Sequence, residues 1–325
     1  MPAINIGDIQ IPVQMVQQTT PSLKIMDSSG TIYYVDAMSG ECPDCLKVSD
    51  GTNIYSIGTR HLVHEASVFD SCETVSLAPG CYYVEVRGGR GGDGGNNDGS
   101  GADAVMQSYS FTITTTTDVY VFRGSDGNAG GVNIDGNIAS GGGGGASGAP
   151  SMVAFGDTVV ISEGGAGGIG GRGVANNSEV YECGAGGGGN AGENSNGLNA
   201  VAHYTWDYNF LMCGAGGGGA PNGAGGDEAS ALSGGYGGGA SVAGGQDSGG
   251  DGGNAWRIVG STNGGAGGAT VAFSCGGHTL NSYGGGGGGA VQAKFTLTVN
   301  MDGGAGGTGT TGASDTSYVR IYKFG

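Results

Sequence analysis

Basic residues, proline and long apolar runs are scarce in this 325-residue chain, and each scarcity removes a class of function. Lys and Arg number 11 against 28 Asp and Glu, which gives a net charge of −17. No cluster of basic residues occurs, and binding to a nucleic-acid backbone depends on such clusters. No apolar stretch reaches the roughly 18 residues that a transmembrane helix needs. We therefore expect neither a nucleic-acid partner nor insertion into a membrane.

The beginning of the sequence lacks the marks of a secretory signal. "MPAINIGDIQIPVQ" has neither a basic first segment nor a continuous apolar core. We accordingly expect a protein that is made in a cytoplasm and stays there, or that leaves by cell lysis or a non-standard route. The seven cysteines (42, 45, 72, 81, 183, 213 and 275) form an odd set without a dense disulfide framework. Free thiols are the expectation that follows for a cytoplasmic assembly.

Glycine, by contrast, is abundant, with 79 residues, and only six of them lie in residues 1–87. Collagen is excluded, because it needs glycine at every third position and abundant proline. Here the glycines cluster, as in "SGGGGGASG" and "SYGGGGGGA", and there are seven prolines. Glycine-rich tracts are otherwise typical of flexible linkers. Strand-like segments interrupt the tracts in this chain, and they favour an ordered region instead.

No amphipathic helical pattern extends beyond a couple of turns, and alternation with a period of two takes its place. "LKIMDSSGTIYYV" from Leu23 and "LKVSDGTNIYSI" from Leu46 repeat one scheme, and each predicts a β-hairpin. Within 80–87 we expect Tyr82, Val84 and Val86 on one face. Such alternation indicates half-buried antiparallel strands. Strands are predicted at 74–87 with a break at Pro79-Gly80, at 108–114, at 118–124, at 317–325, and at 291–299 with Val291, Ala293, Phe295, Leu297 and Val299 on one face.

Glycine-rich segments can themselves form a regular structure, the polyglycine II helix, which has three residues per turn and no internal hydrogen bonds. Such helices can lie close together and bond through their peptide groups, which would pair the buried N–H and C=O groups. The repeated modules "GGAGG" (164–168, 264–268, 303–307) and "CGAGGGG" (183–189, 213–219) fit this arrangement.

We therefore predict an all-β protein that combines antiparallel β-sandwich strands with a packed array of polyglycine II helices. A small β-hairpin module is expected over residues 1–69. The β-sandwich with its glycine-rich region is expected over 70–325, with the polyglycine II helices mainly in 124–315.

The blocks "GGGGGASGAPS", "CGAGGGGNAG", "GAGGGGAPNGAGG" and "YGGGGGGA", separated by variable polar and aromatic segments, resemble the tip adhesin of T-even-type phage tail fibres. In that family a sandwich of polyglycine II helices displays loops that select the bacterial receptor. The ending "GGAGGTGTTGASDTSYVRIYKFG" is similar to the C-termini of other glycine-rich phage tail proteins. The resemblance covers roughly residues 88–325. It is a similarity in the kind and order of sequence blocks, without an aligned signature, and the N-terminal hairpin module departs from it. It implies a virion protein that contacts a host cell.

Under this resemblance, receptor binding belongs to the non-glycine interruptions. "HYTWDYNF", residues 203–210, carries four aromatic residues at alternate positions, so an extended strand would place them on one face. Aromatic side chains stack well on sugars or receptor loops; alternatively, they cover the glycine sandwich. The candidate receptor-binding residues lie within 193–212, around 254–262 and within 272–283, and they are His203, Tyr204, Trp206, Asp207, Tyr208, Asn209, Trp256, Arg257, His278 and Tyr283.

A zinc site and a catalytic site are the two other kinds of site considered. "CPDC" with Cys42 and Cys45, followed by "HLVH" with His61 and His64, has the outline of a zinc site. The histidine spacing is one residue short of the usual range, and a metal-free turn with two small buried thiols is the alternative. Matches to GxGxxG are inevitable at this glycine content, and Asp and Asn beside glycine are explained as turn formers. We predict no catalytic residue, no metal ligand and no cofactor.

The combined reading is a non-enzymatic phage virion protein, a glycine-rich adhesin or fibre-tip protein that binds a glycan or an outer-membrane protein on the host surface. The N-terminal module would attach to other virion proteins or oligomerise, and a homo-oligomer is compatible with this reading. The protein would be assembled in the host cytoplasm and would act outside the cell. The alternatives are a structural fibre, tail or capsid-decoration subunit with a rigid polyglycine II body, and a bacterial surface or matrix protein.

Overall fold

The computed structural model describes residues 60–324 except 98, 136–137, 176–195, 205–209, 228, 233–235, 239–243, 257–260, 295–297 and 315. For residues 1–59, and for several strand residues between 174 and 299, it describes the backbone of the strands only. The described part contains no α-helix, and its single 3-10 turn is Gly95–Asn97. Every pairing between its named strands is antiparallel, so the predicted all-β class of antiparallel strands is confirmed.

The N-terminal strands form one pair and one five-stranded sheet. β1 (Ala3–Ile6) pairs with β2 (Ile9–Pro12). The sheet has the order β3-β4-β5-β7-β6. Both predicted hairpins are confirmed, since β4 pairs with β5 and β6 with β7. The bounds are β3 (Gln14–Val16), β4 (Ser22–Met26), β5 (Ile32–Ser39), β6 (Leu46–Ser49) and β7 (Ile54–Gly58).

Two four-stranded sheets follow, which we call the proximal sandwich. One has the order β11-β10-β28-β8 and the other β16-β15-β12-β9. β28, the last strand, lies between β10 and β8, so it completes a sheet whose first strand begins at Arg60. The bounds are β8 (Arg60–Glu65), β9 (Cys72–Leu77), β10 (Gly80–Arg87), β11 (Gln107–Ile113), β12 (Thr117–Phe122), β15 (Ser151–Phe155), β16 (Thr158–Ser162) and β28 (Tyr318–Phe324).

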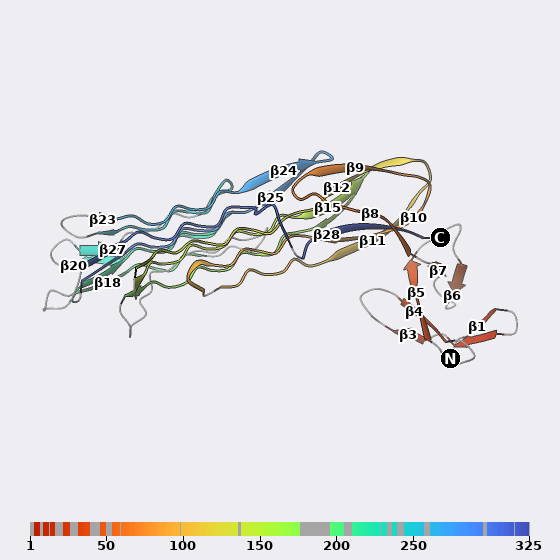
Figure 1. The fold of residues 1–325 in the computed structure, drawn as a ribbon, viewed down its shortest axis with the longest axis horizontal. Coiled ribbons are helices and arrows are strands. Elements are labelled where there is room, and N and C mark those ends of the chain that lie inside the picture. Colours follow the sequence, from red (N-terminus) through yellow and green to blue (C-terminus); the bar gives the residue numbers. More distant parts are fainter. Residues whose placement is uncertain are drawn as a thin grey trace.

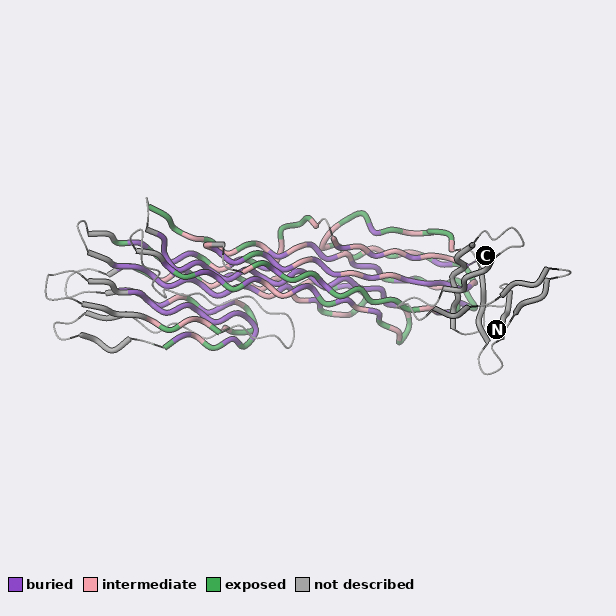
Figure 2. Tube along the Cα trace, turned by 90° about the horizontal axis from the view of Figure 1, so that it is seen from below, coloured by how far each residue is buried: buried purple, intermediate pink, exposed green. Residues whose placement is uncertain are grey.

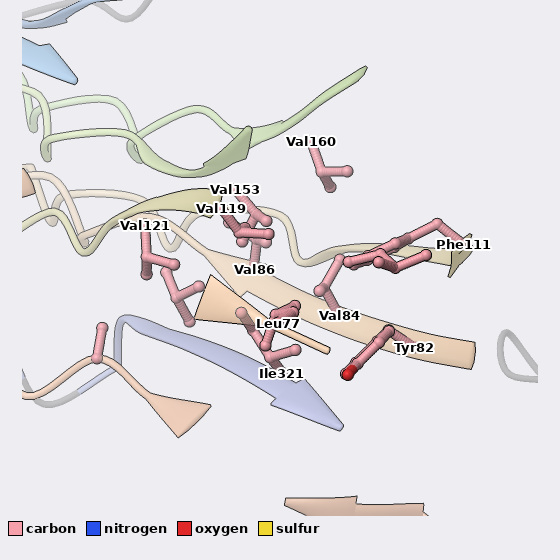
Figure 3. Close-up of a cluster of buried hydrophobic side chains, with 13 residues drawn as sticks. Leu77, Tyr82, Val84, Val86, Phe111, Val119, Val121, Val153, Val160 and Ile321 are labelled. Atoms are coloured by element: carbon pink, nitrogen blue, oxygen red, sulfur yellow. The ribbon is translucent and has the colours of Figure 1, made fainter. Parts of the chain in front are cut away.

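The core of the proximal sandwich lies between these two sheets (Figure 3). Tyr82, Val84 and Val86 are all buried there, which confirms the predicted face of β10. Tyr83, on the opposite face, is buried as well, because it packs against Phe324 and the ring of Tyr322. The strand is therefore covered on both sides at that point. The core members are Ala66, Leu77, Tyr82, Val84, Val86, Phe111, Ile113, Val119, Val121, Val153, Val160, Val319 and Ile321.

Between the two ends of the elongated body, glycine-rich segments run side by side and bond through their main chains (Figures 1 and 2). Segment 141–149 lies in the middle, and all of its residues are buried. Each amide from 141 to 149 donates a hydrogen bond to a neighbouring segment, and the recipients rotate in a fixed order: 283–289, 165–171, 125–131. The order repeats every three residues. Successive amides thus point in three directions around the segment, which binds three neighbours at once.

At many glycines inside this array the packing leaves no room for a side chain. A Cβ added at Gly285 would lie 2.0 Å from the Gly144 carbonyl oxygen, and one at Gly164 would lie 1.8 Å from that of Gly148. Glycine is needed at such points because real Cβ atoms do not approach other atoms below about 3.0 Å. The close approach of main chains is what permits the hydrogen bonds.

The place of a segment in the array follows from its sequence. Central segments are nearly continuous runs of Gly, Ala and Ser, such as 140–149 and 284–290. Outer segments have the repeating sequence pattern Gly-Gly-X, and the third residue, X, faces the outside of the array. In 163–172 the outward residues are Glu163, Ala166, Ile169 and Arg172, and in 302–308 they are Asp302, Ala305 and Thr308. This period of three can be seen in the sequence of both segments.

The prediction of a single strand over 291–299 is wrong. The chain forms two short antiparallel strands, β26 (Val291–Lys294) and β27 (Thr298–Met301), with Val291 opposite Met301. The segment "KFTLT" contains no Gly, Pro, Asn or Asp to signal a turn, so alternation alone could not show where the chain reverses.

We expect Gly145→Ala to lower the free energy of unfolding by about 3 kcal/mol, the upper part of the usual range for overpacking. The new Cβ would lie 2.0 Å from the Gly92 carbonyl oxygen in the centre of the array. The matched control is Gly245→Ala, at an exposed glycine with no atom within 4 Å of the added Cβ, and it should change stability by less than about 0.5 kcal/mol. Urea unfolding followed by circular dichroism measures both, and equal stabilities would contradict the role of close main-chain packing.

Candidate binding surface

A second pair of sheets lies at the end of the array opposite the proximal sandwich (Figure 1). One sheet has the order β18-β19-β26-β27 and the other β20-β21-β22-β23, and strands of the two are in contact, β18 with β20 and β23 with β26. We call their four hairpins, β18–β19, β20–β21, β22–β23 and β26–β27, the distal hairpins. The further bounds are β18 (Val201–Tyr204), β19 (Phe210–Cys213), β20 (Ala229–Leu232), β21 (Tyr236–Gly238), β22 (Ala255–Trp256) and β23 (Ser261–Thr262).

The glycine-rich segments continue directly into these hairpins, so the hairpins project from the end of the array. β19 runs into segment 214–220 of the array, and β26 begins where segment 284–290 ends. Because the array holds the inner end of each strand, the chain reverses at the outer ends. The reversals fall between Tyr204 and Phe210, and between Trp256 and Ser261, which are two of the predicted non-glycine interruptions.

The expectation that 203–210 forms one extended strand is wrong. β18 ends at Tyr204, and Tyr204 lies opposite Phe210 of β19. The aromatic residues therefore come from two antiparallel arms and the connection between them. As in 291–299, the alternating pattern continued across a reversal that no glycine or proline marks.

Three of the ten candidate receptor-binding residues lie on strands of the distal hairpins. His203 and Tyr204 lie on β18, and Trp256 ends β22, each described by its backbone. Trp206, Asp207, Tyr208, Asn209 and Arg257 fall outside the described residues.

His278 and Tyr283 lie elsewhere, near the proximal sandwich. β24 (Val271–Cys275) and β25 (His278–Ser282) form a hairpin around Gly276 and Gly277, whose φ angles of 55° and 82° suit a tight two-residue turn. His278 follows this turn and is half-buried. The Tyr283 amide donates a hydrogen bond to the side-chain Oγ of Ser147 at 2.7 Å, and the Ser147 amide donates one to the Tyr283 carbonyl oxygen at 2.9 Å. The ten candidates thus do not form a single site.

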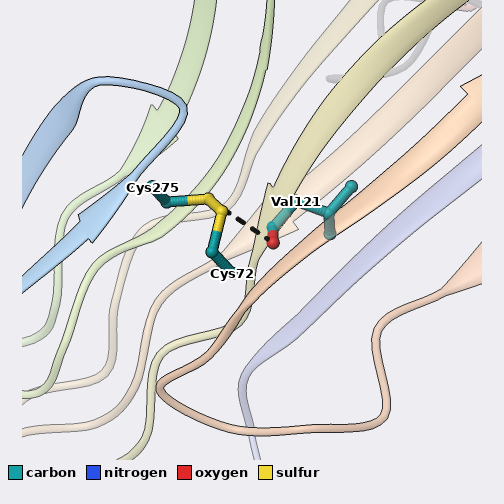
Figure 4. Close-up of a disulfide and its surroundings, with 3 residues drawn as sticks. All are labelled: Cys72, Val121 and Cys275. Carbon is teal, nitrogen blue, oxygen red and sulfur yellow. Dashed lines mark hydrogen bonds between the residues drawn. A yellow bond between two sulfur atoms is a disulfide. The ribbon is translucent and has the colours of Figure 1, made fainter.

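A disulfide between Cys72 and Cys275 fastens this hairpin to β9 (Figure 4). Cys275 is buried, and its Sγ lies 3.7 Å from the Val121 carbonyl oxygen. Phe273 and Leu280 of the hairpin pack with Phe122 of the sandwich. Cys213 is also disulfide-bonded. The expectation of free thiols is therefore wrong for Cys72, Cys213 and Cys275, whereas Cys81 is a thiol outside any disulfide. Cys72 and Cys275 are 203 residues apart in sequence, and a count of cysteines carries no information on which of them meet.

The zinc site considered above falls only partly within the described residues, and among these no group of three or more metal-binding side chains occurs. His61 and His64 both lie on β8, and His64 Nε2 is 3.3 Å from Glu73 Oε2. Cys42 and Cys45 lie outside the described residues.

Two open clefts flank the array, and sequence reasoning missed both. The first, of about 250 Å³, is lined by Arg90, Asp93 and Asp126 among others. Asp93 Oδ1 accepts a hydrogen bond from Arg90 Nη2 at 2.8 Å, and Asp126 Oδ1 accepts one from the Arg90 amide at 2.7 Å. The second, of about 220 Å³, contains Glu163, whose side chain is exposed, although nearby protein atoms displace part of the water around its carboxyl and raise the pKa of that group above its ordinary value. The outward third position of the Gly-Gly-X segments is the signal that could have found Asp93 and Glu163.

No protein-family model matches this chain, and no curated protein matches it in sequence. In the part of the chain that the structure describes, no helix has the length and apolar character to cross a membrane.

We expect the double variant Cys72→Ser/Cys275→Ser to lose about 3 kcal/mol of unfolding free energy, the usual contribution of a native disulfide. The hairpin β24–β25 should then exchange its amide hydrogens faster than the rest of the array, because it loses its covalent tie to β9. Cys81→Ser is the control, at a buried thiol 3.7 Å from Thr112 Oγ1. Hydrogen exchange read by mass spectrometry tests this, and unchanged protection of 271–282 in the double variant would contradict it.

Proposed function

We propose that this chain is a non-enzymatic virion protein of a tailed phage, a glycine-rich adhesin or fibre-tip protein that binds a receptor on the host bacterial surface. The observation that carries the proposal is the grouping of four hairpins at one end of an elongated body (Figure 1). An adhesin needs a recognition surface that projects from its support, and loops on a rigid scaffold are the usual place for binding residues.

We propose further that the glycine-rich segments are polyglycine II helices. Three residues per turn would send successive amides in three directions, and the amides of 141–149 rotate among three neighbours in that way. The outward side chains of 163–172 recur at the same interval. The continuous main-chain bonding would make the array a stiff spacer, which suits a protein that must present its tip away from the particle.

The roles of the other parts follow from this arrangement. The distal hairpins, with Trp206 and Trp256, would contact a glycan or an outer-membrane protein. The N-terminal module would join other virion proteins, no cofactor would be needed, and the protein would act outside the cell after assembly in the host cytoplasm. A structural fibre, tail or decoration subunit is the second candidate, and the completely bonded centre of the array favours it equally.

Binding of the fluorescently labelled full chain to a panel of whole bacterial cells tests the proposal. We expect selective binding to some strains, and Trp206→Ala or Trp256→Ala should weaken it at least about tenfold, as is common for a central aromatic residue in an interface. Tyr120→Ala is the control, since Tyr120 is 38% exposed on β12 of the proximal sandwich. Circular dichroism establishes that each variant is folded.

Two other results would change the proposal. Binding to no strain, together with open-ended assembly of the chain into fibres, would replace the adhesin by the structural subunit. Binding that both tryptophan variants retain and Tyr120→Ala loses would move the recognition surface to the proximal sandwich.

A further inference from the structure

In the part of the chain that the structure describes, β11 is the edge strand of one proximal sheet. β11 pairs with β10 on one side, and no other strand in the described part of the chain pairs with it on the other. Alternate residues of an edge strand direct their N–H and C=O groups outward, where they can pair with another strand. Strand β16, the edge of the second sheet, contacts β11, so the two sheets end on the same side of the sandwich.

β11 lacks the features that usually protect such an edge. It is seven residues long, and its register with β10 runs from 107 to 113 without a bulge. The stretch from 104 to 117 contains no charged residue and no proline. Apolar side chains are also exposed there: Val105 is 73% exposed and Tyr109 47%. Natural proteins normally block an exposed edge with lysine, proline, a bulge or a covering segment.

The same strand is complementary to itself. An antiparallel copy paired about a twofold axis at Ser110 would place Tyr109 opposite the partner's Phe111. Both residues belong to one aromatic row, since their ring centroids are 6.5 Å apart and Phe111 stacks on Phe155 at 4.2 Å. Aromatic pairs across neighbouring strands stabilise a sheet. The pairing would extend this row across the axis and cover Tyr109.

The distribution of charge also favours the β11 edge as the place of contact between two copies of the chain. Each chain carries a net charge of −17, so two copies repel over most of their surfaces. An uncharged edge is where they can approach with the least electrostatic cost. We propose that β11 forms an isologous dimer by pairing antiparallel with β11 of a second copy, which joins two four-stranded sheets into one continuous sheet. This inference does not depend on the proposed function.

The test measures the association state of the full chain by sedimentation equilibrium. We expect a dimer for the wild type and at least about tenfold weaker dimerisation for Ser110→Lys, because the twofold axis sets the two lysines opposite each other. Ser108→Lys is the matched control, since its lysine would face the partner's Thr112, and it should dimerise more tightly than Ser110→Lys. Both lysines can extend to solvent, and thermal unfolding verifies their folding.

A mixture of Ser110→Lys with Ser110→Glu gives a result that a merely destabilised fold could not. Opposite charges would then meet at the axis, so we expect the mixture to form a heterodimer more tightly than either variant alone associates. A wild type that stays monomeric, a wild type that forms trimers, or a dimer that Ser110→Lys leaves unchanged would each overturn the proposal.

Discussion

The main-chain hydrogen bond between adjacent glycine-rich segments is the interaction on which the rest of this molecule depends. Many of these bonds form where two backbones come closer than a Cβ would allow, as at Gly285 beside Gly144. Glycine loses much conformational entropy when it is ordered. That cost is offset where every amide of a segment has a partner, as in 141–149. The array therefore gains its stability from collective pairing of peptide groups and not from burial of side chains.

Side chains contribute mainly at the two ends of the array. The proximal sandwich contains an ordinary hydrophobic core, and its last strand β28 closes a sheet with β10 and β8. The disulfide between Cys72 and Cys275 ties the β24–β25 hairpin to the same end. At the other end the distal hairpins reverse the chain. The bonded glycine-rich segments lie between the two ends and separate the distal hairpins from the sandwich (Figure 1).

The outward positions of the array connect this scaffold to its surface chemistry. Only every third residue of an outer segment can carry a side chain, so the flanks show regularly spaced groups such as Glu163, Ala166 and Ile169. This leaves little continuous apolar surface along the flanks. An uncharged strand edge and an exposed aromatic surface occur together instead at β11, in the proximal sandwich.

Local patterns determined much of the fold. The alternation in 80–87 and 317–325 and the two N-terminal hairpin repeats predicted real strands, because strand faces and turns depend on neighbouring residues. The predictions over 203–210 and 291–299 were wrong, since in both segments the alternating pattern continues across a reversal that no glycine or proline marks. Of the candidate site, only the assignment to non-glycine interruptions came from sequence, and the structure separates His278 and Tyr283 from the distal hairpins.

What the sequence by itself determined is that glycine-rich segments would pack through their backbones, and even which of these segments lie inside the array and which lie at its surface. Only the tertiary structure decided which segments are neighbours and that Cys72 meets Cys275, because glycine runs have no side chains to distinguish one partner from another.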